Sequence, residues 1–310
     1  MIGEQDHRSV SSMCKFARCP RRYFWAKHMG LESVSPVRDL AMTFGSAIHA
    51  GVPWTYSGQL DKAFAEFEKV WADGDSYEDK KRTTRTGKAI LLDLAALHSG
   101  SEFPFEVLEP EIKSFVEKGE TWPHEITFEV DVALPSGKPI TGRIDALMRH
   151  KTSGELWLME YKTSSQLWRT FSELFTTSVQ VETYVMALRV AGYDVVGGFV
   201  EGILVAKGKT EQLPVPVVVS EEEVEGVLEW WRWKDDELVQ LEDSLNVNGK
   251  DSTDPLNWPC ERSACSPYAQ FGLQGFVCEY EPLCTARERW KGLVGMFEQK
   301  ASSPAEGAAE

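Results

Sequence analysis

The sequence lacks long apolar runs and has a deficit of positive charge. Across its 310 residues, 33 Lys and Arg stand against 48 Asp and Glu, which gives a formal net charge of −15. This balance argues against a general nucleic-acid coat, whose affinity comes from neutralising phosphates, and against an anionic membrane surface as partner. The most apolar stretch, 195–206, is interrupted by Glu201 and three glycines, so we expect no segment to span a membrane.

Two catalytic signatures are also missing. The chain has no Gly-rich phosphate loop, which argues against ATP hydrolysis, and no Ser–His–Asp or Cys–His arrangement that would supply a covalent nucleophile. The polar, charged residues 1–8 lack the apolar stretch of a signal peptide, so a cytoplasmic protein is expected. In that compartment the six cysteines should be reduced unless they bind a metal or do redox chemistry.

The overall composition is typical of a folded protein. Hydrophobic residues make up 42% and charged residues 26% of the chain, which is enough apolar material for a sizeable core. The length allows one large domain or two small ones, and the polar tail at 301–310 is expected to be disordered. By sequence pattern the rest of the chain divides into a helical N-terminal part (1–100), an α/β part (101–219) and a C-terminal part with an acidic helix and a cysteine-rich stretch (220–300).

The hydrophobic periodicity changes along the chain. Helical spacing predicts helices over about 11–30, from 44, and over 57–73, 84–98, 171–190 and 220–243. Ser11 or Ser12 is the expected N-cap of the first helix. Alternating, β-branched and aromatic residues predict strands near 105–117, 124–134, 139–149, 155–162, 195–205 and 213–219. This order favours an α/β core preceded by helices.

The most informative stretch is Gly-x-x-Asp at 142–145, then a turn and an apolar strand that ends in Glu160-Tyr161-Lys162. Side chains alternate along a strand, so Glu160 and Lys162 point to one face and Tyr161 to the other. If the strand that carries Asp145 pairs with this one, the three charged groups converge. Two carboxylates suit Mg²⁺ or Mn²⁺, and a nearby lysine could stabilise the negative charge that develops when a phosphodiester is attacked. The alternative is a surface hairpin with a Glu–Lys pair and an exposed Asp.

Three other motifs accompany this constellation. They are a Ser-rich helix with Cys-Pro and aromatic residues at 11–24, Gly-x-x-x-His at 45–49 and Gln-x-x-x-Tyr at 180–184. In this order, and with the hairpin, they resemble the PD-(D/E)XK nuclease superfamily, specifically its RecB-like exonuclease branch. The resemblance covers about 11–190, and it reaches 284 if the cysteines are included. It implies a single domain over 1–300 with a restriction-endonuclease-like α/β core, in which a mixed central sheet is flanked by helices and 101–219 is the catalytic part.

The resemblance also implies a metal centre. Asp145 and Glu160 would bind Mg²⁺ or Mn²⁺ together with His49 and the main-chain carbonyl of Tyr161. Lys162 would be the catalytic lysine in hydrolysis of DNA by a metal-activated water. From the residues alone, His49 could instead be a structural histidine at the start of a helix, hydrogen-bonded to a backbone carbonyl.

Two helical residues and two strand residues extend this set of candidates. Gln180 and Tyr184 lie one turn apart on one helix face, where the resemblance implies that they orient the DNA backbone or catalytic groups. Their alternative role is as a half-buried amphipathic face. Glu125 or Glu129, on the strand before Asp145, is an additional acidic candidate.

The function implied is that of a metal-dependent DNA exonuclease, acting on DNA ends or single strands in repair, recombination or phage DNA processing. Its partners would be DNA and a helicase or recombination protein. Two competing functions remain open. One is a non-catalytic DNA- or protein-binding module on the same fold, although the intact triplet of Asp145, Glu160 and Lys162 speaks against it. The other is a zinc-stapled interaction protein in which the hairpin triplet is accidental.

Four cysteines cluster near the C-terminus, with the spacing C-x4-C-x12-C-x5-C: Cys260, Cys265, Cys278 and Cys284. Cysteines gathered in this way in a reducing compartment favour Zn²⁺ or an iron–sulfur cluster, and scattered buried thiols are the alternative. The resemblance, here to AddB and CRISPR-associated exonucleases, implies a 4Fe–4S cluster. Its expected ligands are Cys19, Cys265, Cys278 and Cys284, although the spacing before Cys278 departs from that family and leaves Cys260 open. Zinc bound to the four C-terminal cysteines is the alternative.

Basic residues gather locally despite the negative total. Between Arg8 and Lys27 there are six Lys or Arg and no acidic residue. The expected contacts to DNA are Arg18, Arg21, Arg22 and Lys27, and a second basic stretch covers 80–88. Aromatic residues at 23–25 either stack on bases or pack inward. By contrast, 221–243 carries ten Asp or Glu and two Lys or Arg, and is expected to be an amphipathic helix with a solvated acidic face.

Overall fold

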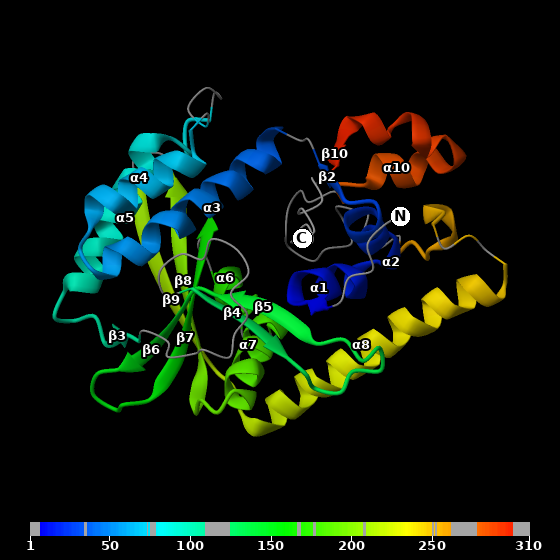
Figure 1. The fold of residues 1–310 in the computed structure, drawn as a ribbon. Helices are drawn as coiled ribbons and strands as arrows, with labels where there is room; N and C mark the ends of the chain where they lie inside the picture. Colours follow the sequence, from blue (N-terminus) through cyan, green and yellow to red (C-terminus); the bar gives the residue numbers. More distant parts are fainter. Residues whose placement is uncertain are drawn as a thin grey trace, which may run out of the picture. The chain divides into compact units, whose positions relative to one another are not determined.

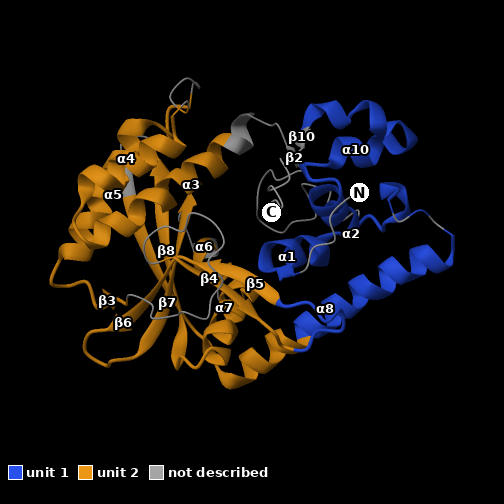
Figure 2. Ribbon diagram, viewed as in Figure 1, with its two compact units in different colours: residues 1–35, 133–139, 230–310 blue, residues 36–132, 140–229 orange. Residues whose placement is uncertain are grey.

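The computed structural model describes residues 7–33, 36–72, 74, 79–108, 125–165, 169–175, 178–206, 209–249, 251, 253–261 and 278–299 (Figure 1). Contacts within the chain divide it into two compact units (Figure 2). Unit 1 contains residues 1–35, 133–139 and 230–310, and unit 2 contains residues 36–132 and 140–229. The single domain expected over 1–300 stays a prediction. No helix within the described ranges has both the length and the apolar character needed to cross a membrane.

Unit 2 is built on a five-stranded sheet with the strand order β3-β6-β7-β8-β9. β7 and β8 run parallel, and the other neighbouring pairs are antiparallel. The strands are β3 (Phe105–Val107), β6 (Ala146–His150), β7 (Leu156–Ser164), β8 (Val195–Ala206) and β9 (Lys209–Val218). The expected mixed central sheet is therefore confirmed.

One face of this sheet packs against three helices that precede it in the chain (Figure 1). They are α3 (Pro36–Tyr56), α4 (Leu60–Val70) and α5 (Thr84–Ser99). Alternate residues of the two central strands, among them Met159, Tyr161, Ile203 and Val205, share a buried cluster with apolar side chains of these helices. The period of two along each strand therefore decides which residues enter this core.

The opposite face of the sheet packs against α7 (Val179–Val190). A Cβ at Gly198 on β8 would lie 2.5 Å from Val181 of α7 and 3.3 Å from Leu158 of β7. Glycine at this position therefore allows the helix to approach the sheet. This is the face toward which Glu160 and Lys162 point, because they share the parity of Leu158 along β7.

A separate antiparallel pair, β4 (Ile126–Val130) and β5 (Ile140–Ile144), also belongs to unit 2. The single strand predicted over 139–149 is wrong, because β5 ends at Ile144 and β6 begins at Ala146. At Asp145 the chain changes its pairing partner from β4 to β7. Ile144 and Ala146 are both buried, so the hydrophobic pattern continues across the break and does not reveal it.

Other predicted boundaries differ at their ends. The helix predicted over 171–190 is two helices, α6 (Arg169–Glu173) and α7, and Ser178 caps the second by accepting a hydrogen bond from the Val181 N–H. The helix predicted from 44 begins at Pro36, and the last strand of the sheet begins at Lys209. Most of the strand predicted over 105–117 lies outside the described residues.

Unit 1 starts with short elements: β1 (Arg8–Ser9), α1 (Val10–Arg18), α2 (Pro20–Tyr23) and a π-helical turn (Phe24–His28). Ser9 caps α1 by accepting a hydrogen bond from the Ser12 N–H, so the predicted caps Ser11 and Ser12 were wrong. The helix is interrupted at Cys19, whose backbone is extended (φ −166°, ψ 116°). The following proline explains this interruption, because proline disfavours helical backbone in the residue before it.

Later elements of unit 1 include most of α8 (Glu221–Val247), α10 (Glu281–Ala286), and the antiparallel pair of β2 (Leu31–Ser33) and β10 (Phe297–Gln299). The predicted acidic helix is therefore present, and it buries Trp231 while leaving 63% of Trp233 exposed. Its Asp235 is fully buried, where it pairs with Arg8 at 2.7 Å and accepts the Ser136 N–H at 2.7 Å. Removing the Arg8 side chain would leave the buried carboxylate without its charged partner.

The core of unit 1 is rich in aromatic rings. Tyr23, Phe24 and Trp25 are all at most 4% exposed. Phe24 lies 5.3 Å from Trp258 between ring centroids, and Trp25 lies 5.1 Å from Trp290. Of the two roles considered for these three rings, inward packing is the one that the structure has.

Candidate active site

The chemically informative motifs meet within unit 2. Asp145 occupies the break between β5 and β6, and the Glu160–Lys162 segment lies on β7. His49 comes from α3, and Gln180 and Tyr184 come from α7. Because β6 pairs with β7 in a register that places Ala146 opposite Met159, Asp145 lies beside the Glu160 segment. The convergence predicted for Asp145, Glu160 and Lys162 depends on this pairing.

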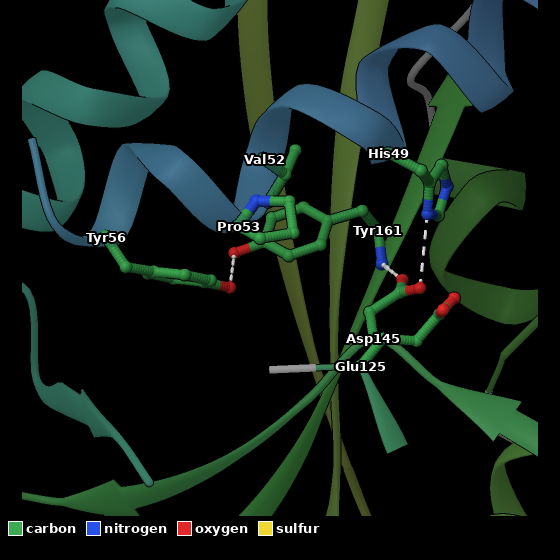
Figure 3. A pocket seen from close by; sticks show the side chains of 7 residues that line it. All are labelled: His49, Val52, Pro53, Tyr56, Glu125, Asp145 and Tyr161. Carbon is green, nitrogen blue, oxygen red and sulfur yellow. Dashed lines mark hydrogen bonds and ion pairs between the residues drawn. The ribbon is translucent and has the colours of Figure 1, made fainter. Parts of the chain in front are cut away.

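Asp145 is held on both oxygens (Figure 3). Its Oδ1 lies 3.1 Å from His49 Nδ1, and its Oδ2 accepts the main-chain N–H of Tyr161 at 2.8 Å. Burial raises the pKa of this carboxyl, but the opposing effects of His49, Lys162 and the Tyr161 N–H leave it below its ordinary value. For His49, burial lowers the pKa, yet Asp145 holds it above the ordinary value. In this contact each of the two groups therefore favours the charged form of the other.

Glu160 is only 3% exposed. Its Oε1 accepts hydrogen bonds from Lys162 Nζ and, at 3.1 Å, from Gln180 Nε2. Its Oε2 is buried and has no hydrogen-bond partner among the described residues. Burial and the charge of Asp145 raise the pKa of Glu160 to about 7, although Lys162 opposes this shift. Glu160 is thus a buried acid with one unused oxygen next to a second carboxylate.

Lys162 supplies the positive charge at this point. Burial lowers its pKa, but the charges of Glu160 and Asp145 outweigh that effect and hold the pKa above its ordinary value. Lys162 is therefore protonated at neutral pH and acts as a charged hydrogen-bond donor, able to stabilise a developing anion.

On α7, Gln180 and Tyr184 face the same group. Gln180 Nε2 donates to the Tyr184 hydroxyl at 2.9 Å as well as to Glu160. Tyr184 in turn sits against the hairpin: a Cβ at Gly142 would lie 2.5 Å from Phe128 and 2.9 Å from the Tyr184 ring. The glycine of the Gly-x-x-Asp motif therefore makes room for the tyrosine of the Gln-x-x-x-Tyr motif, a link that spacing alone does not reveal.

The same argument applies less strictly to Gly45. A Cβ there would lie 3.0 Å from the Thr163 hydroxyl of β7. The glycine of the Gly-x-x-x-His motif therefore sits in close contact with the strand that carries Glu160.

A small cavity adjoins the His49–Asp145 pair (Figure 3). It measures about 10 Å³, which is room for one water molecule. Its lining consists of His49, Val52, Pro53, Tyr56, Glu125, Asp145 and Tyr161. Of the two additional acidic candidates, Glu125 thus lies at the site, where it pairs with Arg143 at 3.2 Å, whereas Glu129 is exposed on β4.

The donors fit a divalent cation by their chemistry. Two carboxylates repel each other in a buried setting, and the unpartnered Glu160 Oε2 lacks the positive partner that a cation would supply. As placed, however, the described His, Cys, Asp and Glu side chains form no group of three that is arranged around a metal. His49, Asp145, Glu160 and the Tyr161 carbonyl are the residues that would hold it.

Three polar residues beside the site were not singled out from the sequence. Tyr56 and His98 contact the Tyr161 hydroxyl, and Glu201 lies opposite Tyr161 on the parallel strand β8. Burial raises the pKa of Glu201 to about 7 and lowers that of His98 to about 3. Of these three residues, Glu201 could have been noticed from the sequence. It is an acid within the apolar run 195–206, and such a run predicts a buried strand.

The residues expected to contact DNA lie in unit 1. Arg21 donates to the carbonyls of Trp258 at 2.9 Å and Leu256 at 3.2 Å, and Arg22 pairs with Glu279 at 2.9 Å. These two guanidinium groups hold unit 1 together internally. Arg18 is exposed and Lys27 is half-buried.

Four of the cysteines considered as ligands also lie in the described part of unit 1, whereas Cys265 lies outside the described residues. The Glu261 N–H donates to Cys19 Sγ at 3.4 Å, which brings the neighbouring Cys260 segment to Cys19. Burial, Cys260 and Cys278 raise the pKa of Cys284 to about 12. Burial also raises that of Cys278, with Glu279 and Cys19 adding to the shift. These thiols interact, but as placed they do not surround a metal.

Three comparisons with known proteins were made. The family model described as the PD-(D/E)XK nuclease superfamily matches residues 7–284. A search of curated proteins found no match. Among solved structures, a candidate exonuclease from Eubacterium rectale is 14% identical, with a TM-score of 0.45, over 77% of this chain and 82% of that one. SSO0001 is 15% identical, with a TM-score of 0.30, over 74% and 76%. The family match covers most of the chain, and the chain belongs to the PD-(D/E)XK nuclease superfamily.

Proposed function

We propose that this nuclease is a metal-dependent DNA exonuclease of the RecB-like type. The observation that carries the proposal is the convergence of Asp145, Glu160 and a protonated Lys162, with one buried Glu160 oxygen left without a partner. A decayed, non-catalytic member of the fold would have no need to retain two carboxylates and a lysine at one buried point, where they are costly to desolvate.

The division of labour follows from the contacts. A bound Mg²⁺ or Mn²⁺ supplies positive charge to the scissile phosphate and lowers the pKa of water. Asp145, fixed by His49 and the Tyr161 N–H, and Glu160, fixed by Gln180, would present the oxygens that hold the cation. Lys162 donates to the phosphate oxygen on which negative charge develops. The Gln180–Tyr184 pair keeps the Glu160 carboxylate in place.

We infer that the substrates are DNA ends or single strands, in repair, recombination or phage DNA processing. The exposed Arg18, together with Lys27, supports phosphate contact in unit 1, and Arg21 and Arg22 contribute by shaping that surface. Because the chain as a whole is strongly negative, we expect this binding to be weak and salt-sensitive, and to be assisted by a helicase or recombination partner.

End-labelled linear duplex, linear single-stranded and circular DNA, each with Mn²⁺, Mg²⁺ or EDTA, test this function. The proposal predicts cleavage of linear DNA that EDTA abolishes and that circular DNA resists. Asp145→Ala should be inactive, whereas Lys69→Ala, at an exposed position on α4, should match the wild type. A wild type that binds DNA but cleaves none would instead support the non-catalytic module, and cleavage of circular DNA would replace the exonuclease by an endonuclease.

We also infer a 4Fe–4S cluster in unit 1, held by Cys19, Cys265, Cys278 and Cys284. Its support is that Cys19 raises the pKa of Cys278 and Cys278 raises the pKa of Cys284, so these thiols lie close enough to interact, and a bound metal would stabilise their thiolates. The position of Cys260 beside Cys19 makes it the competing ligand. Zinc held by Cys260, Cys265, Cys278 and Cys284 is the alternative cofactor.

Metal analysis of anaerobically purified protein distinguishes these assignments. The proposal expects iron and sulfide, which Cys265→Ser should lose and Cys260→Ser should keep. Cys14→Ser, at an exposed position on α1, is the control. Loss of iron in Cys260→Ser alone would assign Cys260 instead. Zinc without iron in the wild type would contradict the cluster.

A further inference from the structure

Behind the proposed metal site, on the other face of β7, lies a chain of polar side chains from three elements. Tyr161 and Thr55 are each 1% exposed, and Tyr56 and His98 are half-buried. Thr55 and Tyr56 belong to α3, His98 to α5 and Tyr161 to β7. The surrounding cluster is apolar, so the buried hydroxyls of Thr55 and Tyr161 need hydrogen-bond partners within it.

Counting protons fixes the direction of every hydrogen bond. The Thr55 hydroxyl lies 2.6 Å from the Val52 carbonyl, which has no proton, so Thr55 donates there. Thr55 must then accept from His98 Nδ1–H at 2.8 Å, which leaves Nε2 of a neutral imidazole as an acceptor. The Tyr161 hydroxyl donates to this Nε2 at 3.1 Å, and it accepts from Tyr56. The chain therefore runs one way, from Tyr56 to Val52.

Tyr161 links this chain to the site. Its hydroxyl is bonded within the chain, while its main-chain N–H donates to Asp145 Oδ2 at 2.8 Å. α3 carries His49, which contacts the other oxygen of Asp145, and two turns later carries Tyr56. The chain thus joins, by directional bonds, the helix and the strand whose separation sets the His49–Asp145 contact.

We propose that Tyr56, His98 and the Tyr161 hydroxyl are positioning residues that hold α3 and β7 at the separation that the metal site requires. This inference rests on the proposed function. Apolar contacts alone would tolerate sliding of the helix along the strand, whereas a fully satisfied hydrogen-bond chain fixes distances and angles. The residues that orient metal ligands commonly act in this way.

The test uses Tyr161→Phe, His98→Phe and the double variant in the full-length chain. Mn²⁺ binding is measured without DNA by electron paramagnetic resonance, and the Mn²⁺ dependence of cleavage is measured in parallel. Each single variant should weaken Mn²⁺ binding about tenfold, as loss of a partner that orients a ligand does, and should raise the Mn²⁺ concentration for half-maximal cleavage equally. The double variant should bind Mn²⁺ with the same affinity as the single variant that binds it less tightly, because both substitutions remove the same link.

Phe67→Leu is the control, because Phe67 lies in the same core but takes no part in the hydrogen-bond chain. It should lower the melting temperature without changing Mn²⁺ affinity. If His98→Phe does not fold, Tyr56→Phe removes only the terminal hydroxyl and should still weaken Mn²⁺ binding. The positioning role alone would be overturned if the wild type is active but the variants bind Mn²⁺ as tightly as it does. It would also be overturned if the effects of the single variants add up in the double variant, or if Phe67→Leu weakens Mn²⁺ binding as much as they do. A wild type that neither binds Mn²⁺ nor cleaves DNA would overturn the proposed function as well.

Discussion

Glu160 and Glu201 lie on neighbouring strands of one sheet and look alike until their neighbours are considered. Each is 3% exposed, each has one carboxyl oxygen without a hydrogen-bond partner among the described residues, and each has its pKa raised to about 7. The register places Glu160 opposite Val200 and Tyr161 opposite Glu201, so the two acids occupy opposite faces.

The difference between the two acids lies in their electrostatic surroundings. Glu160 is subject to Asp145, Lys162 and His49, whereas burial alone raises the pKa of Glu201. A buried acid with a raised pKa is therefore not by itself a sign of catalysis. A specific set of opposing charges around the acid is the stronger sign. The predictions below test that distinction, from the largest expected effect to the smallest.

Among the next four variants, Lys162→Ala should have the largest effect, because it removes a positive side chain that donates to Glu160. We expect the cleavage rate to fall roughly 10²–10³-fold, the usual loss for a donor that stabilises developing charge. Single-turnover cleavage at saturating Mn²⁺ measures it. A rate within threefold of the wild type would remove Lys162 from the chemistry.

Glu201→Gln should change stability with pH. The pKa of Glu201 is 4.5 in its ordinary state and about 7 in the folded chain, so the unfolded state releases this proton first as the pH rises. As the pH rises between those two values, the wild type therefore loses about 3 kcal/mol of unfolding free energy through this group. Urea unfolding at pH 4.5 and pH 7 should show the variant gaining that amount relative to the wild type. An unchanged difference between the two proteins would contradict the raised pKa.

Gly142→Ala should disturb both packing and activity. The new Cβ would lie 2.5 Å from Phe128 and 2.9 Å from Tyr184, and such overpacking costs about 1–3 kcal/mol of unfolding free energy. Cleavage should fall as well, because Tyr184 is displaced. Gly226→Ala on α8, where nothing lies within 4 Å, is the control and should be neutral or stabilising. Equal behaviour of the two variants would refute the packing role.

Gln180→Ala should have the smallest effect, since it removes hydrogen bonds to Glu160 and Tyr184 but no charge. We expect about a tenfold lower cleavage rate, as for other partners that orient a ligand. Glu182→Ala, on the same helix, should cleave at the wild-type rate. A rate loss shared by both variants would point to damage of α7 instead.

Much of the site follows from the sequence because its residues obey strict local periods. The period of two placed Glu160 and Lys162 on one face and Tyr161 on the other, and the turn after 149 allowed the strand of Asp145 to pair with them. Gln180 and Tyr184, four residues apart, share a helix face as expected and are hydrogen-bonded.

The remainder depends on tertiary contacts that no local pattern encodes. The break at Asp145 is invisible because Ile144 and Ala146 continue the buried pattern while the strand changes partner. No sequence pattern distinguishes Tyr56 and His98 from other helical residues, and their role follows only from their hydrogen bonds to the Tyr161 hydroxyl. Likewise, Arg21 and Arg22 look like a basic surface until Trp258 and Glu279 receive their hydrogen bonds.

The most direct test compares Glu160→Gln with Glu201→Gln in Mn²⁺-dependent cleavage of linear DNA. Both substitutions keep size and remove one buried acid, so they differ only in which face of the sheet loses it. We predict that Glu160→Gln abolishes cleavage and that Glu201→Gln retains the wild-type rate. Cleavage retained by Glu160→Gln, or lost equally in both variants, would contradict the assignment of the active site to the Asp145–Glu160–Lys162 face.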